Sequence, residues 1–402
     1  MFRGLNRADL WIATLAAAGI LAITMGIRQS SGLFVSPLNT ATGLGIATIS
    51  LAFAISQFAW GAIQPIAGAL ADRYGPAPVL VASLLVLALG MAITPFMDTS
   101  FGLIVTLGLL AAAGAGGGSF SVLIGAAAQR LPAEARGSAS GIINAGGSFG
   151  QFVFAPLVQK LIQAVGWMGA MWSVALIALA ALPLVRTLCP PRAAVTHAEP
   201  GNGLGRAVRD ALADRNYLLL SAGFFTCGFH IAFLVTHLPE EVALCGLPPS
   251  VASWSLAIIG LSNIAGSLVA GAWVGQYRSK YILFWMYASR ALLIVLYLAA
   301  PKTATTFYLF AAGLGFTWLA TVPPTAAVIS KLHGVRYLGT LFGLALLSHQ
   351  TGGFLGAWLG GIAVTAHGDY TWMWYADAAL ALLAAVVNLP IREARIEARA
   401  AA

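Results

Sequence analysis

The chain has 402 residues, of which 59% are hydrophobic and only 8% are charged, and its formal net charge is +8 at pH 7. Because soluble domains carry about 25% charged residues, this chain has too few polar side chains to cover a surface that faces water. A water-soluble fold is therefore excluded, and we expect the protein to lie in lipid.

Apolar stretches of roughly 20 residues, the length that crosses a bilayer as a helix, recur along the whole chain. They are continuous rather than alternating, which excludes the pattern of a membrane β-barrel. The sequence therefore predicts an all-α membrane protein with twelve transmembrane helices in two groups of six. In chain order the stretches lie near residues 9–35, 47–71, 77–97, 101–129, 137–164, 167–186, 217–238, 250–275, 280–300, 303–330, 338–366 and 370–390.

The basic residues predict the orientation in the membrane, because cytoplasmic loops carry an excess of Lys and Arg. If the N-terminus is cytoplasmic, 17 of the 21 basic residues fall in cytoplasmic segments, and only Lys160 and Lys302 fall in outside loops. The other two, Arg28 and Arg290, lie inside apolar stretches. Both termini are thus expected in the cytoplasm. This asymmetry accounts for the positive charge, so no nucleic-acid partner is expected.

Residues 187–214 interrupt the apolar pattern and form the longest polar segment. We expect an N-terminal six-helix bundle over residues 1–186 and a C-terminal six-helix bundle over residues 215–402. The segment between them, 187–214, is predicted to be a cytoplasmic linker with a short surface helix near 204–214.

The two predicted bundles contain similar sequences at similar places. Residues 68–75 close the second stretch, and residues 271–278 close the eighth, 203 residues later. Residues 144–149 in the fifth stretch likewise parallel residues 350–354 in the eleventh. Two parallel six-helix repeats are an architecture of secondary transporters, with the binding site near the midplane where the repeats meet.

The segment 68–75, GALADRYG, resembles the signature loop of the major facilitator superfamily, although Pro76 and Pro78 stand where members often have basic residues. The twelve stretches, the linker and the second copy of the loop fit the same pattern, so the resemblance covers essentially the whole chain. It implies the two-bundle major facilitator fold. It also implies a gating role at the cytoplasmic face for Gly68, Asp72, Arg73 and Gly75.

Within that superfamily, residues 26–34, GIRQSSGLF, resemble the first span of bacterial porters of the monocarboxylate and oxalate/formate group. The segments 228–230, GFH, and 337–343, YLGTLFG, add to this resemblance. The chain departs from better-known monocarboxylate porters, for which an Arg in the eighth span is expected, because Arg290 lies in the ninth. The resemblance implies transport of a small organic anion.

Arg28 and His230 occupy matching positions, 202 residues apart, in the first and seventh stretches. An ionisable residue inside an apolar span is costly and usually marks the path of a substrate or ion. The guanidinium of Arg28 matches a carboxylate, which it can bind through two hydrogen bonds, and the polar Gln29 beside it favours a cavity over snorkelling to the interface. His230 could bind substrate, carry a proton or be a satisfied core histidine.

The remaining candidates are weaker. His349 is a second possible proton carrier, and a structural ion pair between Arg290 and Asp377 is expected between the ninth and twelfth stretches. Acidic residues other than Asp377 fall at the ends of stretches or in loops, which argues against a porter for lipophilic cations. Gln29 is a further candidate for substrate binding. Neutral hydrogen bonds to substrate could also come from Asn144, Asn263 and Gln350, for which bonding between helices is the alternative.

The sequence thus predicts a secondary transporter of the cell inner membrane that moves a small organic anion by alternating access. The expected anion is a monocarboxylate, and proton symport is preferred to exchange against a counter-anion. The alternatives are an efflux permease for drug-like or amphipathic compounds and a non-transporting sensor or scaffold. Neither a catalytic constellation nor a metal or cofactor motif is found in the sequence, and we expect a monomer.

Overall fold

The computed structural model describes residues 7–189 and 203–393 of the protein. Within these residues the regular secondary structure is helical. The N-terminal half consists of α1 (Arg7–Ser30), η1 (Ser31–Phe34), α2 (Val35–Thr42), α3 (Ile46–Tyr74), α4 (Pro76–Ile93), η2 (Thr94–Phe96), α5 (Ser100–Leu103), η3 (Ile104–Ala111), α6 (Ala112–Gly117), α7 (Phe120–Arg130), α8 (Ala133–Ala180) and α9 (Leu182–Leu188). After the short helix α10 (Leu204–Ala213), the C-terminal half consists of α11 (Arg215–Leu244), α12 (Pro249–Val274), α13 (Ser279–Ala299), α14 (Ala304–Thr317), α15 (Val322–His333), α16 (Leu338–His367) and α17 (Thr371–Asn388).

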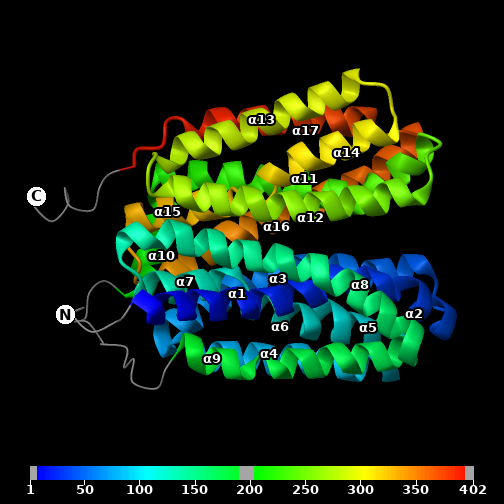
Figure 1. The fold of residues 1–402 in the computed structure, drawn as a ribbon, viewed down its shortest axis with the longest axis horizontal. Helices are drawn as coiled ribbons and strands as arrows, with labels where there is room; N and C mark the ends of the chain where they lie inside the picture. The colour runs from blue at the N-terminus through cyan, green and yellow to red at the C-terminus, as the bar shows by residue number, and fades with distance from the viewer. Residues whose placement is uncertain (1–6, 190–202, 394–402) are drawn as a thin grey trace, which may run out of the picture.

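Each of the twelve predicted stretches falls on one helix or on consecutive helical segments. Among the described residues, ten stretches are long and apolar enough to cross a membrane. The other two predicted stretches lie on α3 and α16, which are 29 and 30 residues long. Both helices run alongside the ten membrane-spanning stretches (Figure 1). The all-α membrane fold is thus confirmed.

The helix α8 contains the predicted stretch 137–164 and most of the stretch 167–186, which continues into α9. At Gly166 the backbone leaves the helical conformation with a φ of +74°, between the stretches 137–164 and 167–186. Side chains are strained at a positive φ, so a glycine is the residue that allows this turn.

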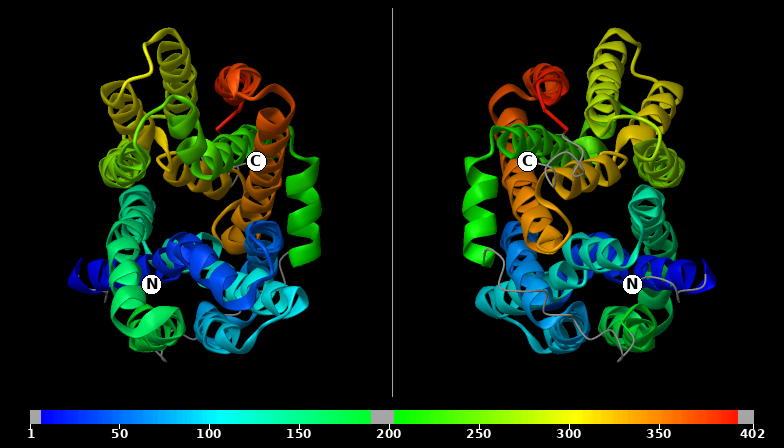
Figure 2. Two further views of the ribbon diagram at one scale, coloured as in Figure 1. Left: turned by 90° about the vertical axis from the view of Figure 1, so that its right-hand side faces the viewer. Right: turned by 90° about the vertical axis from the view of Figure 1, so that its left-hand side faces the viewer.

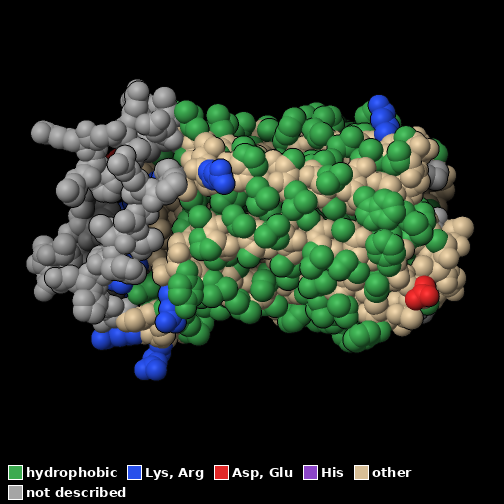
Figure 3. Space-filling model, turned by 90° about the horizontal axis from the view of Figure 1, so that it is seen from below, with side chains coloured by type: hydrophobic (Ala, Val, Ile, Leu, Met, Phe, Trp, Pro, Cys, Tyr) green, Lys and Arg blue, Asp and Glu red, His purple; other side chains and the backbone are tan. Residues whose placement is uncertain are grey.

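Figure 1 shows the two halves side by side, with α1 beginning and α17 ending at the same end of the molecule. Viewed along the helices, the halves form two separate groups (Figure 2). They are joined mainly by α3 packing against α16 and by α8 packing against α12. The face in Figure 3 carries hydrophobic side chains along its length, as expected for a surface in lipid.

Two of the membrane-spanning stretches are broken near their middle, at corresponding places in the two halves. In the N-terminal half, α6 ends at Gly117 and α7 begins at Phe120; in the C-terminal half, α14 ends at Thr317 and α15 begins at Val322. Carbonyl groups at such a break lose their helical partners and need other donors, particularly in a membrane. The hydroxyl of Thr24 donates to the carbonyl of Gly118 at 3.0 Å.

Candidate functional site

Arg28 lies in the last turn of α1, and its side chain is half-buried. Its Nη2 donates to Oε1 of Gln57, and its Nη1 lies 3.5 Å from Oε1 of Gln29. The guanidinium also lies 4.2 Å from the ring centroid of Trp60, a cation–π geometry. Among the described residues no carboxylate forms an ion pair with Arg28. The guanidinium is therefore held by neutral groups, and its charge is free to attract an anion.

Gln57 and Trp60 reach Arg28 together because they stand three residues apart on α3 and share one face of that helix. Trp60 is 3% exposed and packs edge-on against Phe120 of α7, with 6.3 Å between the ring centroids. The aromatic ring beneath Arg28 is thus fixed by the core of the N-terminal half.

A chain of polar contacts continues from Arg28 into the C-terminal half. The main-chain carbonyl of Gln57 accepts a hydrogen bond from Nε2 of Gln350 at 3.0 Å, and Oε1 of Gln350 lies 2.9 Å from Nδ1 of His349. A Cβ at Gly61 would lie only 2.4 Å from Cβ of Gln350, so the glycine permits this close approach of α3 and α16. The structure thus brings Arg28, Gln350 and His349 together through Gln57.

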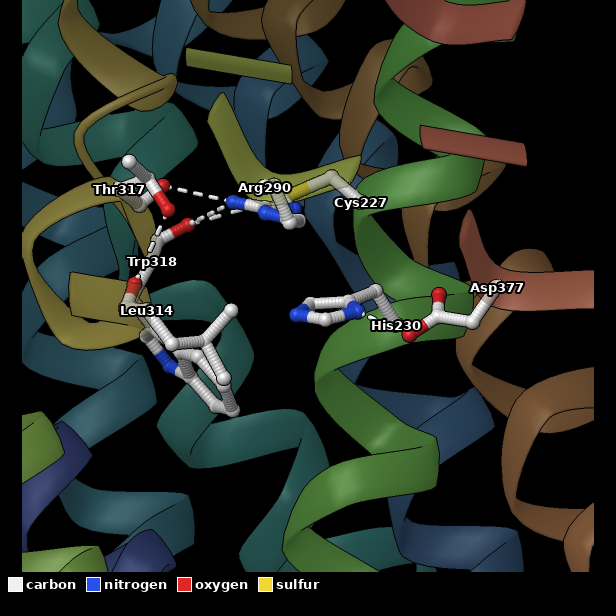
Figure 4. A network of polar contacts seen from close by, with 7 residues as sticks. All are labelled: Cys227, His230, Arg290, Leu314, Thr317, Trp318 and Asp377. Carbon is white, nitrogen blue, oxygen red and sulfur yellow. Dashed lines mark hydrogen bonds and ion pairs between the residues drawn. The ribbon is translucent and has the colours of Figure 1, made fainter. Parts of the chain in front are cut away.

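His230 does not share this environment, although it matches Arg28 in sequence. Its side chain is 1% exposed, and its Nδ1 forms a hydrogen bond with Oδ2 of Asp377 on α17. Its Nε2 has no hydrogen-bond partner among the described residues. Figure 4 shows this edge of the ring pointing toward the side of Leu314 and Trp318.

The expected ion pair between Arg290 and Asp377 is wrong. Nη2 of Arg290 donates to the carbonyls of Thr317 and Trp318 at 2.6 and 3.1 Å, and Nη1 donates to Sγ of Cys227 at 3.3 Å. The physical reason is the break between α14 and α15, which leaves carbonyl groups that a guanidinium can satisfy. Asp377 pairs with His230 instead (Figure 4).

Asn144 and Asn263 are fully buried and bond between helices, which was the alternative to substrate binding. Nδ2 of Asn144 donates to the carbonyl of Leu319 at 2.7 Å and to the hydroxyl of Ser267 at 2.8 Å. Asn263 donates to the hydroxyl of Ser148 at 2.6 Å and accepts from the N–H of Leu319 at 2.9 Å. Their donor groups are therefore occupied by contacts between the halves and by the break in the tenth stretch.

The segment 68–75 lies where α3 crosses α16. A Cβ at Gly68 would lie 2.3 Å from the carbonyl oxygen of Gly339, so only glycine allows this contact. Oδ2 of Asp72 accepts hydrogen bonds from the N–H and the hydroxyl of Thr340, at 2.8 and 2.7 Å. The other two residues of the predicted gating segment, Arg73 and Gly75, make no such contact with α16 among the described residues.

Arg73 stacks on the neighbouring ring of Tyr74 at 5.2 Å, and Gly75 ends α3 with a φ of +88°. Asp72 therefore provides the polar link between the halves in this segment, which is the geometry that a gate at this end would need.

A cavity of about 290 Å³ opens at the same end, between α7, α8 and α15. Arg136 and Lys331 line it, together with Ser140 and Ser330. Arg136 donates to the carbonyl of Ala128 in α7 and to that of Leu131 just after this helix, and Lys331 pairs with Glu393 at 2.9 Å. The cavity is thus walled by both halves and carries basic side chains.

Sequence reasoning missed three partners that shape these sites. Trp60 was not singled out, although its position one helical turn after Gln57 signals a shared face. Thr340 lies far from Asp72 in sequence, and no pattern connects the two. Cys227 precedes the Gly228-Phe-His segment, but its contact with Arg290 depends on how α11 and α13 pack.

The geometry described so far is that of a polytopic membrane transporter with two similar halves and polar side chains where they meet. The profile of the Major Facilitator Superfamily matches residues 14–244 and again residues 243–402. The chain belongs to this superfamily of transporters, and it is not an enzyme.

Two curated relatives show the breadth of the similarity. Monocarboxylate transporter 13 of Rattus norvegicus is 27% identical over 376 residues, which cover 90% of this chain and 84% of that protein. The Oxalate:formate antiporter of Oxalobacter formigenes is 24% identical over 374 residues, which cover 89% of this chain and 86% of that protein. Among solved structures, the proton:xylose symporter XylE bound to 6-bromo-6-deoxy-D-glucose matches with a TM-score of 0.76 and 15% identity, over 97% of this chain and 98% of that one.

Proposed function

We propose that this protein moves a small organic anion, a monocarboxylate, across the cell inner membrane by alternating access. The observation that carries the proposal is Arg28, a half-buried guanidinium that no carboxylate among the described residues neutralises. A charge held only by neutral oxygens and a ring face is a receptor for an anion, and its planar fork fits a carboxylate.

The surroundings of Arg28 support an alternating-access role. Gln57 contacts both Arg28 and Gln350, so a ligand on the guanidinium would lie close to the contact between α3 and α16. The names of two relatives, a monocarboxylate transporter and an oxalate:formate antiporter, are in keeping with a carboxylate substrate. Proton symport is the coupling that we propose, and His230 and His349 are the candidate side chains for the proton.

The test is uptake of labelled short-chain mono- and dicarboxylates into proteoliposomes, with and without an inward proton gradient. The parent protein is expected to accumulate at least one monocarboxylate when the gradient is present. Arg28→Gln should reduce uptake by about tenfold to a hundredfold, because a hydrogen-bonded charge contributes about 1.5–3 kcal/mol.

The matched control is Arg206→Gln, which removes one positive charge from the exposed face of α10 and should leave uptake unchanged. If neither the parent nor Arg28→Gln takes up any carboxylate of the panel, the proposal is contradicted and efflux of amphipathic compounds is favoured.

A further inference from the structure

Three ionisable side chains meet inside the C-terminal half. His230, Arg290 and Asp377 are each 1% exposed and come from α11, α13 and α17. Figure 4 shows His230 between the carboxylate of Asp377 on one side and the break that follows α14 on the other, with the guanidinium of Arg290 beside them. Nε2 of His230 and Oδ1 of Asp377 have no hydrogen-bond partner in the described part of the chain.

The charges of this cluster balance only in one protonation state. Arg290 stays positively charged, and an ionised Asp377 offsets it while His230 is neutral. The other titratable groups that face the cluster are Cys227 on α11, Tyr287 on α13 and His349 on α16. A proton taken up by His230 or Asp377 therefore adds one net positive charge to a buried site. Such a charge is costly inside a membrane bundle unless another change compensates for it.

Arg290 connects this cluster to the contact between the two halves. It holds the carbonyls of Thr317 and Trp318, which immediately precede Leu319. The carbonyl of Leu319 accepts from Asn144 of the N-terminal half at 2.7 Å. The break at residues 318–321 thus contacts the ionisable cluster on one side and the opposite half on the other.

The N-terminal half has no such cluster at the corresponding positions. With the offset of 203 residues that relates segments 68–75 and 271–278, the places of Arg290 and Asp377 are taken by Leu87 and Val174, which are 1% and 0% exposed. The corresponding break after α6 is satisfied by the hydroxyl of Thr24. The same helical arrangement therefore forms in the N-terminal half without these charges.

We propose that His230 and Asp377 together form the proton-binding site, and that Arg290 and the break at residues 318–321 transmit its protonation to the contact between the halves. Asp377 shares the proton with His230, and Arg290 is a positioning residue. A proton on the pair changes the charge balance that keeps Arg290 hydrogen-bonded to the carbonyls of Thr317 and Trp318. The break at residues 318–321 would then shift, and with it the hydrogen bond between Leu319 and Asn144. This inference rests on the proton coupling proposed above, and it adds the site and the path.

The test measures conformation without a substrate. Nitroxide labels at Ser100→Cys and Thr305→Cys, both exposed and at the start of α5 and α14, report the separation of the halves by double electron–electron resonance in nanodiscs. Cys189 and Cys245 are replaced by Ser, and the fully buried Cys227 stays. In this background the distance distribution is recorded across about pH 5 to 8, the range in which a histidine titrates.

We expect a pH-dependent shift of the distance distribution that is lost in His230→Gln and in Asp377→Asn. The matched control is His237→Gln, another buried histidine of α11, which bonds to Tyr370 and the carbonyl of Ala357; it should keep the shift. Arg290→Lys keeps the positive charge but removes the two terminal nitrogens of the guanidinium that bind the carbonyls and Cys227. It should therefore lose the distance shift, while infrared spectroscopy should still show the protonation of the Asp377 carboxyl that the parent shows.

A shift that survives in both His230→Gln and Asp377→Asn, or its absence from the parent background, would overturn the proposed proton site. A full shift in Arg290→Lys would overturn the path through the break. Because no substrate is present, these results are independent of whether the protein carries a carboxylate. Transport of a carboxylate without the pH-dependent shift would refute this inference and leave the proposed substrate standing.

Discussion

At the scale of single residues, Arg28 and Arg290 show how the same side chain takes different roles. Both lie inside membrane-spanning stretches, where an unpaired charge is costly. Arg290 donates through Nη1 and Nη2 to three acceptors, two of them carbonyl groups at a helix break, while its Nε has no hydrogen-bond partner in the described part of the chain. Arg28 rests on a ring face and two neutral side chains. The first arrangement occupies both terminal nitrogens of the guanidinium, whereas the second leaves room for an anion.

Gln57 offers a sharp test of this difference, because Gln57→Glu places a carboxylate against Arg28 with almost no change in shape. The new carboxylate would pair with the guanidinium and compete with the substrate. We expect KM for the transported anion to rise by about tenfold to a hundredfold, the effect of a charge-assisted hydrogen bond. The measurement is initial uptake rate against substrate concentration in proteoliposomes.

The control for that variant is Gln57→Leu, which removes the hydrogen bond to Arg28 but adds no charge. Its KM should rise less than that of Gln57→Glu. Equal kinetic constants for the two variants would show that Arg28 does not attract the anion by its charge.

At the scale of the elements, α3 and α16 control the approach of the two halves. Gly68 contacts Gly339, Asp72 bonds to Thr340, and Gln57 bonds to Gln350. On the other side of the molecule α8 and α12 cross just as closely, since a Cβ at Gly271 would lie 2.8 Å from the carbonyl oxygen of Gly137. Both crossings lack room for even one methyl group, so the contact between the halves depends on small residues.

Gly68→Ala should therefore push α3 away from α16 at the predicted cytoplasmic end. A cysteine introduced at Ser140, which lines the nearby cavity, should then react faster with a water-soluble maleimide. The matched control is Gly260→Ala in α12, where an added Cβ meets nothing within 4 Å. Equal labelling rates in Gly68→Ala and the control would contradict the interpretation of this crossing as a closed gate.

Much of the fold follows from the sequence, because each helix needs about 20 apolar residues to cross the bilayer and such stretches recur along the chain. The placement of Arg28 follows as well, since few charges lie inside the stretches. The partner of Asp377 could not be predicted, because pairing depends on the rotation of α11, α13 and α17 about their axes. Asn144 was ambiguous for the same reason, since a buried amide serves a helix contact as readily as a ligand.

At the scale of the whole molecule, the two halves share their arrangement but differ in chemistry. Asn144 and Gln350, which correspond in the repeat, both reach across to the opposite half. Buried charge is divided unequally, with Arg28 in the N-terminal half and the cluster of His230, Arg290 and Asp377 in the C-terminal half. This division assigns the anion to one half and the proton to the other in the account proposed here.

The orientation of the whole molecule can be tested with its own three cysteines, each studied in a variant that keeps only that one. The positive-inside pattern predicts that Cys189 lies at the cytoplasmic end and Cys245 at the outside end. Both are partly exposed, whereas Cys227 is buried. A membrane-impermeant maleimide added to intact cells should label Cys245 alone, and Cys189 should react only after the membrane is opened. Labelling of Cys189 in intact cells would reverse the topology.

The most direct test of the central claim, that Arg28 binds a carboxylate, is counterflow of a labelled monocarboxylate in proteoliposomes, because exchange needs no gradient and does not depend on the coupling ion. The account predicts that the parent protein exchanges the label, that Arg28→Lys exchanges it with a KM raised by about tenfold, and that Arg28→Gln exchanges it about tenfold to a hundredfold more slowly. Counterflow by Arg28→Gln at the rate and KM of the parent would contradict the account.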